Sequence, residues 1–161
     1  PKKEIVLSDK EQEKAEGNIK GFMDELLKDL PEDTTYEVIK DSKAIYVNIS
    51  SDNLGFLIGY RGETLYAFQS ILSAIAGKGI DNKVRVILDI QGYKEKRKKT
   101  LEDLAQKVAS TVIRTKKSVT LEPMQAYERK IIHSKLQENN KVETISIGEE
   151  PHRRIVISLK K

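Results

Sequence analysis

Two glycines three positions apart enclose the most distinctive short segment of the sequence, Gly59-Tyr60-Arg61-Gly62. Glycine has no Cβ, so the backbone beside it can come close to a phosphodiester and can adopt left-handed conformations. Arg61 adds a positive charge, and Tyr60 lies outside the apolar pattern of its neighbours. A helix beginning after Gly62 would point its N-terminal amides at the same phosphates. The segment predicts a phosphate-contacting loop, and a plain turn that needs glycine is the alternative.

A second pair, Arg129 and His133, has the i, i+4 spacing of one helical face. A guanidinium and an imidazole side by side can grip a phosphate or stack under an unpaired base. The two lie roughly 40° apart at about 100° per residue, so we expect them to project together from the edge of the buried surface. Surface decoration is the alternative for so short a motif.

A basic run, Lys94-Glu95-Lys96-Arg97-Lys98-Lys99, opens a predicted long helix. Residues 91–117 hold nine basic and three acidic side chains. Positive charge at a helix N-terminus opposes the helix dipole, which favours a functional reason for the run. We expect Lys96, Lys98 and Lys99 to contact phosphates, whereas a merely solvated helix face remains the alternative.

Other chemistries find little support in the sequence. The chain has no Cys and two His, so thiolate metal sites and disulfides are excluded and a typical zinc site is not expected. No Gly-Lys-Ser/Thr follows the glycine segment, which argues against a nucleotide-phosphate loop. His133 has no evident nucleophile or paired carboxylate around it, so we expect no enzyme and no cofactor. No apolar run approaches the ~18 residues of a membrane span.

The hydrophobic pattern predicts an α+β protein. Helices are expected at 9–30, briefly from the Asp52/Asn53 cap to Gly59, and at 63–76, 92–114 and 123–138, the last with Pro123 in its first turn. Strands are expected at 35–40, 44–50, 83–90, 142–147 and 154–159, with a loop or short strand over 115–122. The helix at 63–76 should bury Leu65, Phe68, Ile71, Leu72 and Ile75, and that at 92–114 should bury Leu101, Leu104, Ala105, Val108 and Val112.

The glycine segment and the elements around it resemble a KH domain of type II over about residues 10–90. The predicted order of helix, strand, strand, helix, helix, strand matches that arrangement, with a three-stranded sheet and its helices on one face. The resemblance implies that the loop clamps about four nucleotides of a single strand. It also implies that Ile58, Leu65 and one hairpin face line an apolar groove beneath the bases.

The rest of the chain resembles the domain named for its Arg-x-x-x-His signature, here called the R-three-H domain. The resemblance rests on 121–124, 127–129 and 146–154, and the connection over 89–97 also looks like that of the bacterial Jag family (SpoIIIJ-associated proteins, or KhpB). His152 stands where that family would have an aromatic ring, and Ala126 replaces a helix-entry proline. The resemblance does not extend to the family's small N-terminal domain.

The sequence therefore predicts a KH domain over 1–91, then a connecting helix and a small α/β R-three-H domain over 92–161. We expect a cytoplasmic single-stranded RNA-binding protein without membrane insertion. The resemblance implies a post-transcriptional regulator linked to cell elongation and division, paired with a small KH-only protein or with itself. A protein-interaction adaptor and a single-stranded DNA binder are the alternatives. The expected contacts are Ile58, Gly59, Tyr60, Arg61, Gly62, Leu65, Lys96, Lys98, Lys99, Arg129, His133, Arg153 and Arg154.

Overall fold

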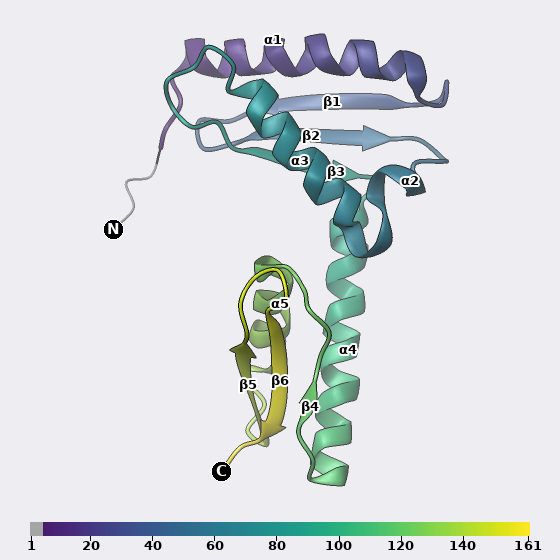
Figure 1. Cartoon of the computed structure of the whole chain (residues 1–161), viewed down its shortest axis with the longest axis vertical. Coiled ribbons are helices and arrows are strands. Elements are labelled where there is room, and N and C mark those ends of the chain that lie inside the picture. The colour runs from purple at the N-terminus through teal and green to yellow at the C-terminus, as the bar shows by residue number, and fades with distance from the viewer. Residues whose placement is uncertain (1–4) are drawn as a thin grey trace. The chain divides into compact units, whose positions relative to one another are not determined.

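The computed structural model describes residues 5–161, so the first four residues of the predicted KH domain lie outside it. The chain divides into two compact units, with the boundary between Lys94 and Glu95. Figure 1 shows the elements of both units along the chain. Each unit has its own apolar core, and each is described by itself below.

The first unit contains the predicted order of helix, strand, strand, helix, helix, strand. Its elements are α1 (Asp9–Leu26), a 3₁₀ turn η1 (Leu27–Asp29), β1 (Thr35–Lys40), β2 (Ile45–Ser50), α2 (Gly55–Ile58), a 3₁₀ turn η2 (Tyr60–Gly62), α3 (Glu63–Ala76) and β3 (Val86–Ile90). Helix α1 is shorter than expected, because its last turn tightens into η1 before Pro31. Helix α2 begins at Gly55 without a side-chain cap, so the expected cap at Asp52/Asn53 is wrong. Strand β3 begins three residues later than expected.

The three strands form one sheet in the order β1-β2-β3. Strand β2 pairs antiparallel with β1 and parallel with β3. Alternate residues of β2 and β3 are buried, and they share a core with Ile19 and Met23 of α1 and Leu72 of α3. Helices α1 and α3 therefore cover the same face of the sheet (Figure 1). This arrangement confirms the predicted α+β class.

Helix α3 uses polar side chains to cover the free edge of β3. Gln69 Oε1 accepts a hydrogen bond of 3.0 Å from the backbone N–H of Leu88, and Ser73 Oγ accepts one of 3.2 Å from Val86. An uncovered strand edge leaves backbone donors unpaired, so these contacts set the rotation of the helix. As a result Ile71 is 53% exposed, and the prediction that it is buried is wrong.

The second unit is built from α4 (Tyr93–Thr115, which begins two residues before the boundary), β4 (Val119–Thr120), α5 (Ala126–Leu136), β5 (Val142–Ile147) and β6 (Arg154–Leu159). Its strands form an antiparallel sheet in the order β4-β6-β5. Strands β5 and β6 have the predicted bounds. A loop or a short strand was expected over 115–122, and the structure has the short strand β4 there.

Two details of the second unit differ from the prediction. Helix α4 buries Leu101, Ala105, Ala109 and Val112, whereas Leu104 lies on the flank and is 37% exposed. Helix α5 begins at Ala126, so Pro123 precedes the helix instead of occupying its first turn. The Gln125 backbone N–H donates to Glu128 Oε2 at 3.2 Å, which satisfies one backbone donor at the helix entrance.

Over residues 5–161, no helix combines the length and the apolar character that crossing a membrane requires.

Candidate nucleic-acid interface

The turn between α2 and α3 depends on the backbone freedom of Gly59. Its φ of 71° and ψ of −177° fall in a region that is essentially restricted to glycine. A Cβ built at this position would overlap the Thr64 side chain. Gly59 therefore ends α2, and its N–H donates to the Gly55 carbonyl at 2.9 Å.

Gly62 completes the reversal with a left-handed conformation, φ 80° and ψ 11°. A Cβ here would lie 2.8 Å from Tyr93 Cε1 and 3.1 Å from Tyr66 Cε2, too close for either ring to stay in place. The two glycines thus let the chain turn within van der Waals reach of its neighbours. Helix α3 starts at the next residue, with its amide groups directed at the loop.

Tyr60 and Arg61 form the outer part of this loop. Tyr60 is 69% exposed, and Arg61 Cζ lies 4.8 Å from the centre of its ring, within the range of a cation–π contact. Phe56, one turn earlier in α2, is 60% exposed and was not among the predicted contacts. An aromatic residue so close to the glycine segment could have indicated a contact. Phe56 stands beside Leu57 and Ile58, however, and a run of apolar residues is more typical of a core.

The two side chains predicted to line a groove beneath the loop, Ile58 and Leu65, differ in their exposure. Leu65 is completely buried in the core of the first unit, so the expectation that it lines the groove is corrected to a supporting role beneath it. Ile58 is half-buried and packs against the same core. Contact between Ile58 and a base stays a prediction, and the exposed rings nearest to Ile58 in the chain are those of Phe56 and Tyr60.

The structure divides the basic run into buried and exposed members. Lys94 is half-buried and its Nζ donates to Gln69 Oε1 at 2.9 Å, and burial lowers the pKa of its ammonium group. Arg97 Nε pairs with Glu128 Oε1 at 2.7 Å, and both side chains are largely buried. The three lysines predicted to contact phosphates, Lys96, Lys98 and Lys99, are exposed.

Arg129 is 7% exposed and faces the turn between β5 and β6. Its guanidinium donates to the Met124 carbonyl and to Glu150 Oε1, each at 2.7 Å. The expectation that Arg129 projects outward beside His133 is therefore wrong, because the Met124 carbonyl and the Glu150 carboxylate of the turn hold the guanidinium in a buried position. A role of Arg129 in nucleic-acid binding stays a prediction, and from this buried position the role would be indirect, through the turn that Arg129 holds.

His133 is tied to strand β5 by both ring nitrogens. Nδ1 lies 2.6 Å from Thr144 Oγ1, and Nε2 lies 2.9 Å from Ser146 Oγ. Hydroxyl groups both donate and accept, so either neutral tautomer is satisfied here. Burial lowers the pKa of His133, and the neighbouring Arg129 charge lowers it further.

The turn held by Arg129 carries Arg153, and Arg154 is the first residue of β6 directly after it. Arg153 donates to the Gly148 carbonyl at 3.3 Å, and Arg154 donates to the His152 carbonyl at 3.1 Å. Both side chains are half-buried, whereas His152 between them and the turn is exposed. The signature pair and the arginine-bearing turn therefore form one hydrogen-bonded assembly.

Residues 5–161 contain no group of three His, Asp or Glu side chains arranged to hold a metal ion. What the geometry offers is a glycine-built loop at a helix N-terminus, exposed rings and unpaired lysines. These are the parts of a nucleic-acid-binding protein with two small domains.

Comparison with protein families agrees with this class. A model described as "KhpA/KhpB, KH domain" matches residues 19–90, and a model of the R-three-H domain matches residues 99–159. Proteins named "RNA-binding protein KhpB" are similar to this chain: 47% identical over 129 residues in Clostridium symbiosum, 39% over 126 in Bacillus subtilis and 39% over 115 in Lactiplantibacillus plantarum. These matches cover 80%, 77% and 71% of this chain.

The chain belongs to the KhpB family. It spans only part of the relatives it matches, namely 58% of the Clostridium protein, 61% of the Bacillus protein and 36% of the Lactiplantibacillus protein.

We expect Gly59→Ala to lower the free energy of unfolding of the chain by about 1–3 kcal/mol, because alanine would be held in a conformation that only glycine tolerates. Gly55→Ala is the matched control, since a Cβ there meets nothing within 4 Å. Urea unfolding of both variants measures the difference. Equal stabilities would show that the loop relaxes freely around a side chain.

The lowered pKa of His133 gives a pH dependence with a definite sign. Because the unfolded chain binds the proton near pH 6.5 and the folded chain only below that, the contribution of His133 is complete above about pH 6.5 and is lost as the pH falls. Urea midpoints at pH 7.5 and 5.5 should differ less in His133→Gln than in the wild type. His152→Gln, at the exposed histidine, should keep the wild-type difference, and an unchanged difference in His133→Gln would contradict the assignment.

Proposed function

We propose that this chain binds single-stranded RNA, with the Gly59–Gly62 loop as its main phosphate contact. The observation that carries the proposal is the pair of glycine conformations that places the exposed Tyr60 and the half-buried Arg61 at the start of the 14-residue helix α3. Backbone amides, a helix dipole and a guanidinium then converge on one anion position. A loop of this type in KH domains clamps about four nucleotides.

The named relatives support RNA as the ligand. Each is described as an RNA-binding protein, and the similarity covers both domains of this chain. Single-stranded DNA remains the alternative ligand, since both nucleic acids present phosphodiester groups and unpaired bases to the loop. Competition between RNA and DNA oligonucleotides of one sequence separates the two.

We propose that the R-three-H domain contributes through Arg153 and Arg154, with Arg129 and His133 as the residues that position them. Arg129 secures the turn through Glu150 and is itself held by the Met124 carbonyl, and His133 secures β5, which leads into the turn. The exposed lysines Lys96, Lys98 and Lys99 supply further charge. Electrostatic contacts of this kind are independent of sequence and sensitive to salt.

We infer a binding role without catalysis. His133 and Ser146 are a histidine–hydroxyl pair, but the other ring nitrogen contacts Thr144, where a serine nucleophile would need a carboxylate to orient the imidazole. The relatives carry binding names and not enzyme names.

We further propose the cellular role that the family resemblance implies, a cytoplasmic post-transcriptional regulator linked to cell elongation and division. Pairing with a small KH-only protein, or with a second copy, belongs to the same proposal. The specific observation in favour of pairing is Ile71, an apolar side chain of α3 that is 53% exposed.

The loop is tested by replacing Tyr60 and Arg61 together with Asp. Two negative charges at the anion position should weaken binding of a single-stranded oligonucleotide at least about tenfold, equivalent to ~1.4 kcal/mol. Both residues lie outside the core, so circular dichroism and the urea midpoint should stay at the wild-type values. Equal affinities would remove the loop from the interface, and the adaptor function would then be favoured.

The positioning role of Arg129 is tested with a double-mutant cycle. Arg129→Ala should weaken RNA binding in the wild type but should add little in a chain that already carries Arg153→Gln and Arg154→Gln, because residues that act through one another are not additive. Affinities are compared only under conditions where each variant is folded, and Arg129→Lys serves as a milder variant. Additive losses would instead mean that Arg129 contacts RNA directly.

A further inference from the structure

A groove lies between α4 and α5 of the second unit, on the side of α5 away from the signature residues. Its volume is about 740 Å³, within the ~300–1,000 Å³ of ordinary ligand sites. It is lined by Lys98, Glu102, Gln106, Tyr127, Lys130, Ile131, Ser134, Lys135 and Glu138. Arg129 and His133 contact the turn and β5 and take no part in this lining.

The groove has an apolar centre and a charged rim. Tyr127 and Ile131 are half-buried and lie one helical turn apart on α5, and Ile131 packs against the core of the second unit. Lys98, Lys130 and Lys135 bring three positive charges to the rim, against the two carboxylates of the same groove. An aromatic face beside flexible cations suits an unstacked base with its flanking phosphates.

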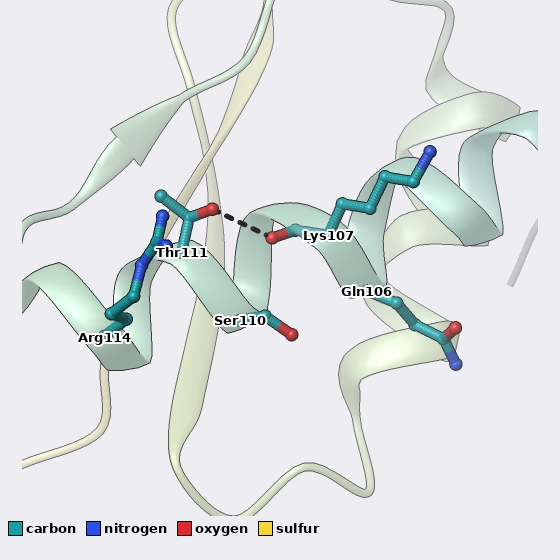
Figure 2. A pocket seen from close by; sticks show the side chains of 5 residues that line it. All are labelled: Gln106, Lys107, Ser110, Thr111 and Arg114. Atoms are coloured by element: carbon teal, nitrogen blue, oxygen red, sulfur yellow. Dashed lines mark hydrogen bonds between the residues drawn. The ribbon is translucent and has the colours of Figure 1, made fainter.

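The polar surface continues from the groove along α4. Gln106 also lines a second hollow of about 490 Å³ with Lys107, Ser110, Thr111 and Arg114. Figure 2 shows Lys107, Thr111 and Arg114 in succession on one side of the helix. The Thr111 hydroxyl donates to the Lys107 carbonyl at 3.1 Å. Lys107 and Arg114 are the charged residues that line the hollow. No acidic residue occurs between Leu104 and Leu121.

We propose that this groove and hollow form a second single-strand RNA contact in the R-three-H domain, distinct from the surface of Arg129, His133 and the arginine-bearing turn. One base lies in the α4–α5 groove against Tyr127 and Ile131, and the backbone passes over Lys130, Lys135 and then the Lys107/Arg114 hollow. The inference rests on the proposed function, because it names a further contact for the same ligand.

The charge of the surface favours RNA over a protein partner. Lys98, Lys107, Arg114, Lys130 and Lys135 give five cations, whereas Glu102 and Glu138 give two anions. The apolar centre is confined to two side chains of α5, smaller than the apolar core that a stable protein interface normally has. A short apolar site within a cationic track matches the alternation of base and phosphate along a single strand.

The test is the salt dependence of RNA binding by the full chain. If Lys130 and Lys135 each neutralise a phosphate, replacing both with Gln should flatten the slope of log affinity against log salt by about 1.4, at roughly 0.7 per phosphate for single strands. Lys107→Gln with Arg114→Gln should flatten it by a similar amount. Lys160→Gln with Lys161→Gln removes the same charge from exposed residues at the end of the second unit and should change the slope much less.

A second measurement locates the base. Photocrosslinking of a 4-thiouridine oligonucleotide should label the peptide that contains Tyr127, and the Tyr127→Phe variant, which keeps the ring, should keep that label. Absence of the label, together with slopes equal to those of the control variant, would overturn the inference. A third outcome separates the two proposals: the wild type and the Lys130/Lys135 variant bind RNA equally, and the Tyr60/Arg61 variant does not bind. That result would support the loop as an RNA contact and would contradict the groove. If the wild type bound no RNA, the proposed function itself would fail. The inference would fail with it, and a protein partner would then be the occupant to test for the groove.

Discussion

Polar groups that fold away from water need hydrogen-bond partners, and in this protein that requirement decides which side chains remain for binding. Two small units leave little interior in which to do so. In the second unit Arg129 forms hydrogen bonds with the turn between β5 and β6, and His133 forms hydrogen bonds with β5. Both side chains of the signature are thereby occupied within the protein. In the first unit Gln69 and Ser73 complete the edge of β3. Lys96, Lys98 and Lys99 of α4 and Tyr60 at the tip of the glycine loop are the side chains that stay exposed.

The glycine loop achieves its exposure by the opposite means, through backbone conformation. Gly59 and Gly62 turn the chain so tightly that neighbouring rings and the Thr64 side chain fill the space a Cβ would need. Tyr60 and Arg61, the two residues between them, thereby lie outside the buried core, and Tyr60 is 69% exposed. A loop defined by its backbone presents its amide groups in a fixed arrangement, which lowers the entropy that binding would otherwise cost.

The sequence predicted most of the secondary structure, and the limits of that prediction are physical. Strands β1, β5 and β6 have the predicted bounds because alternation bounded by turn residues depends on local spacing alone. The rotation of α3 was not predictable, since Ile71 is turned outward by hydrogen bonds between Gln69, Ser73 and a strand that follows later in the chain. Helical spacing likewise placed Arg129 at the edge of the core, but its acceptor Glu150 lies 21 residues further along. Long-range polar pairing is invisible to a periodic pattern.

The buried pair of Arg97 and Glu128 has a consequence for how this domain can diverge. Loss of either partner alone leaves an uncompensated charge in the interior, which typically costs about 3–5 kcal/mol, whereas replacement of both by apolar residues of similar volume is often neutral. A unit of this size has a modest margin of stability to absorb the first loss. Arg97 and Glu128 are therefore expected to change together during evolution, although they lie 31 residues apart in the chain. The helix that carries the basic run and the helix that carries the signature motif are then coupled in their evolutionary history.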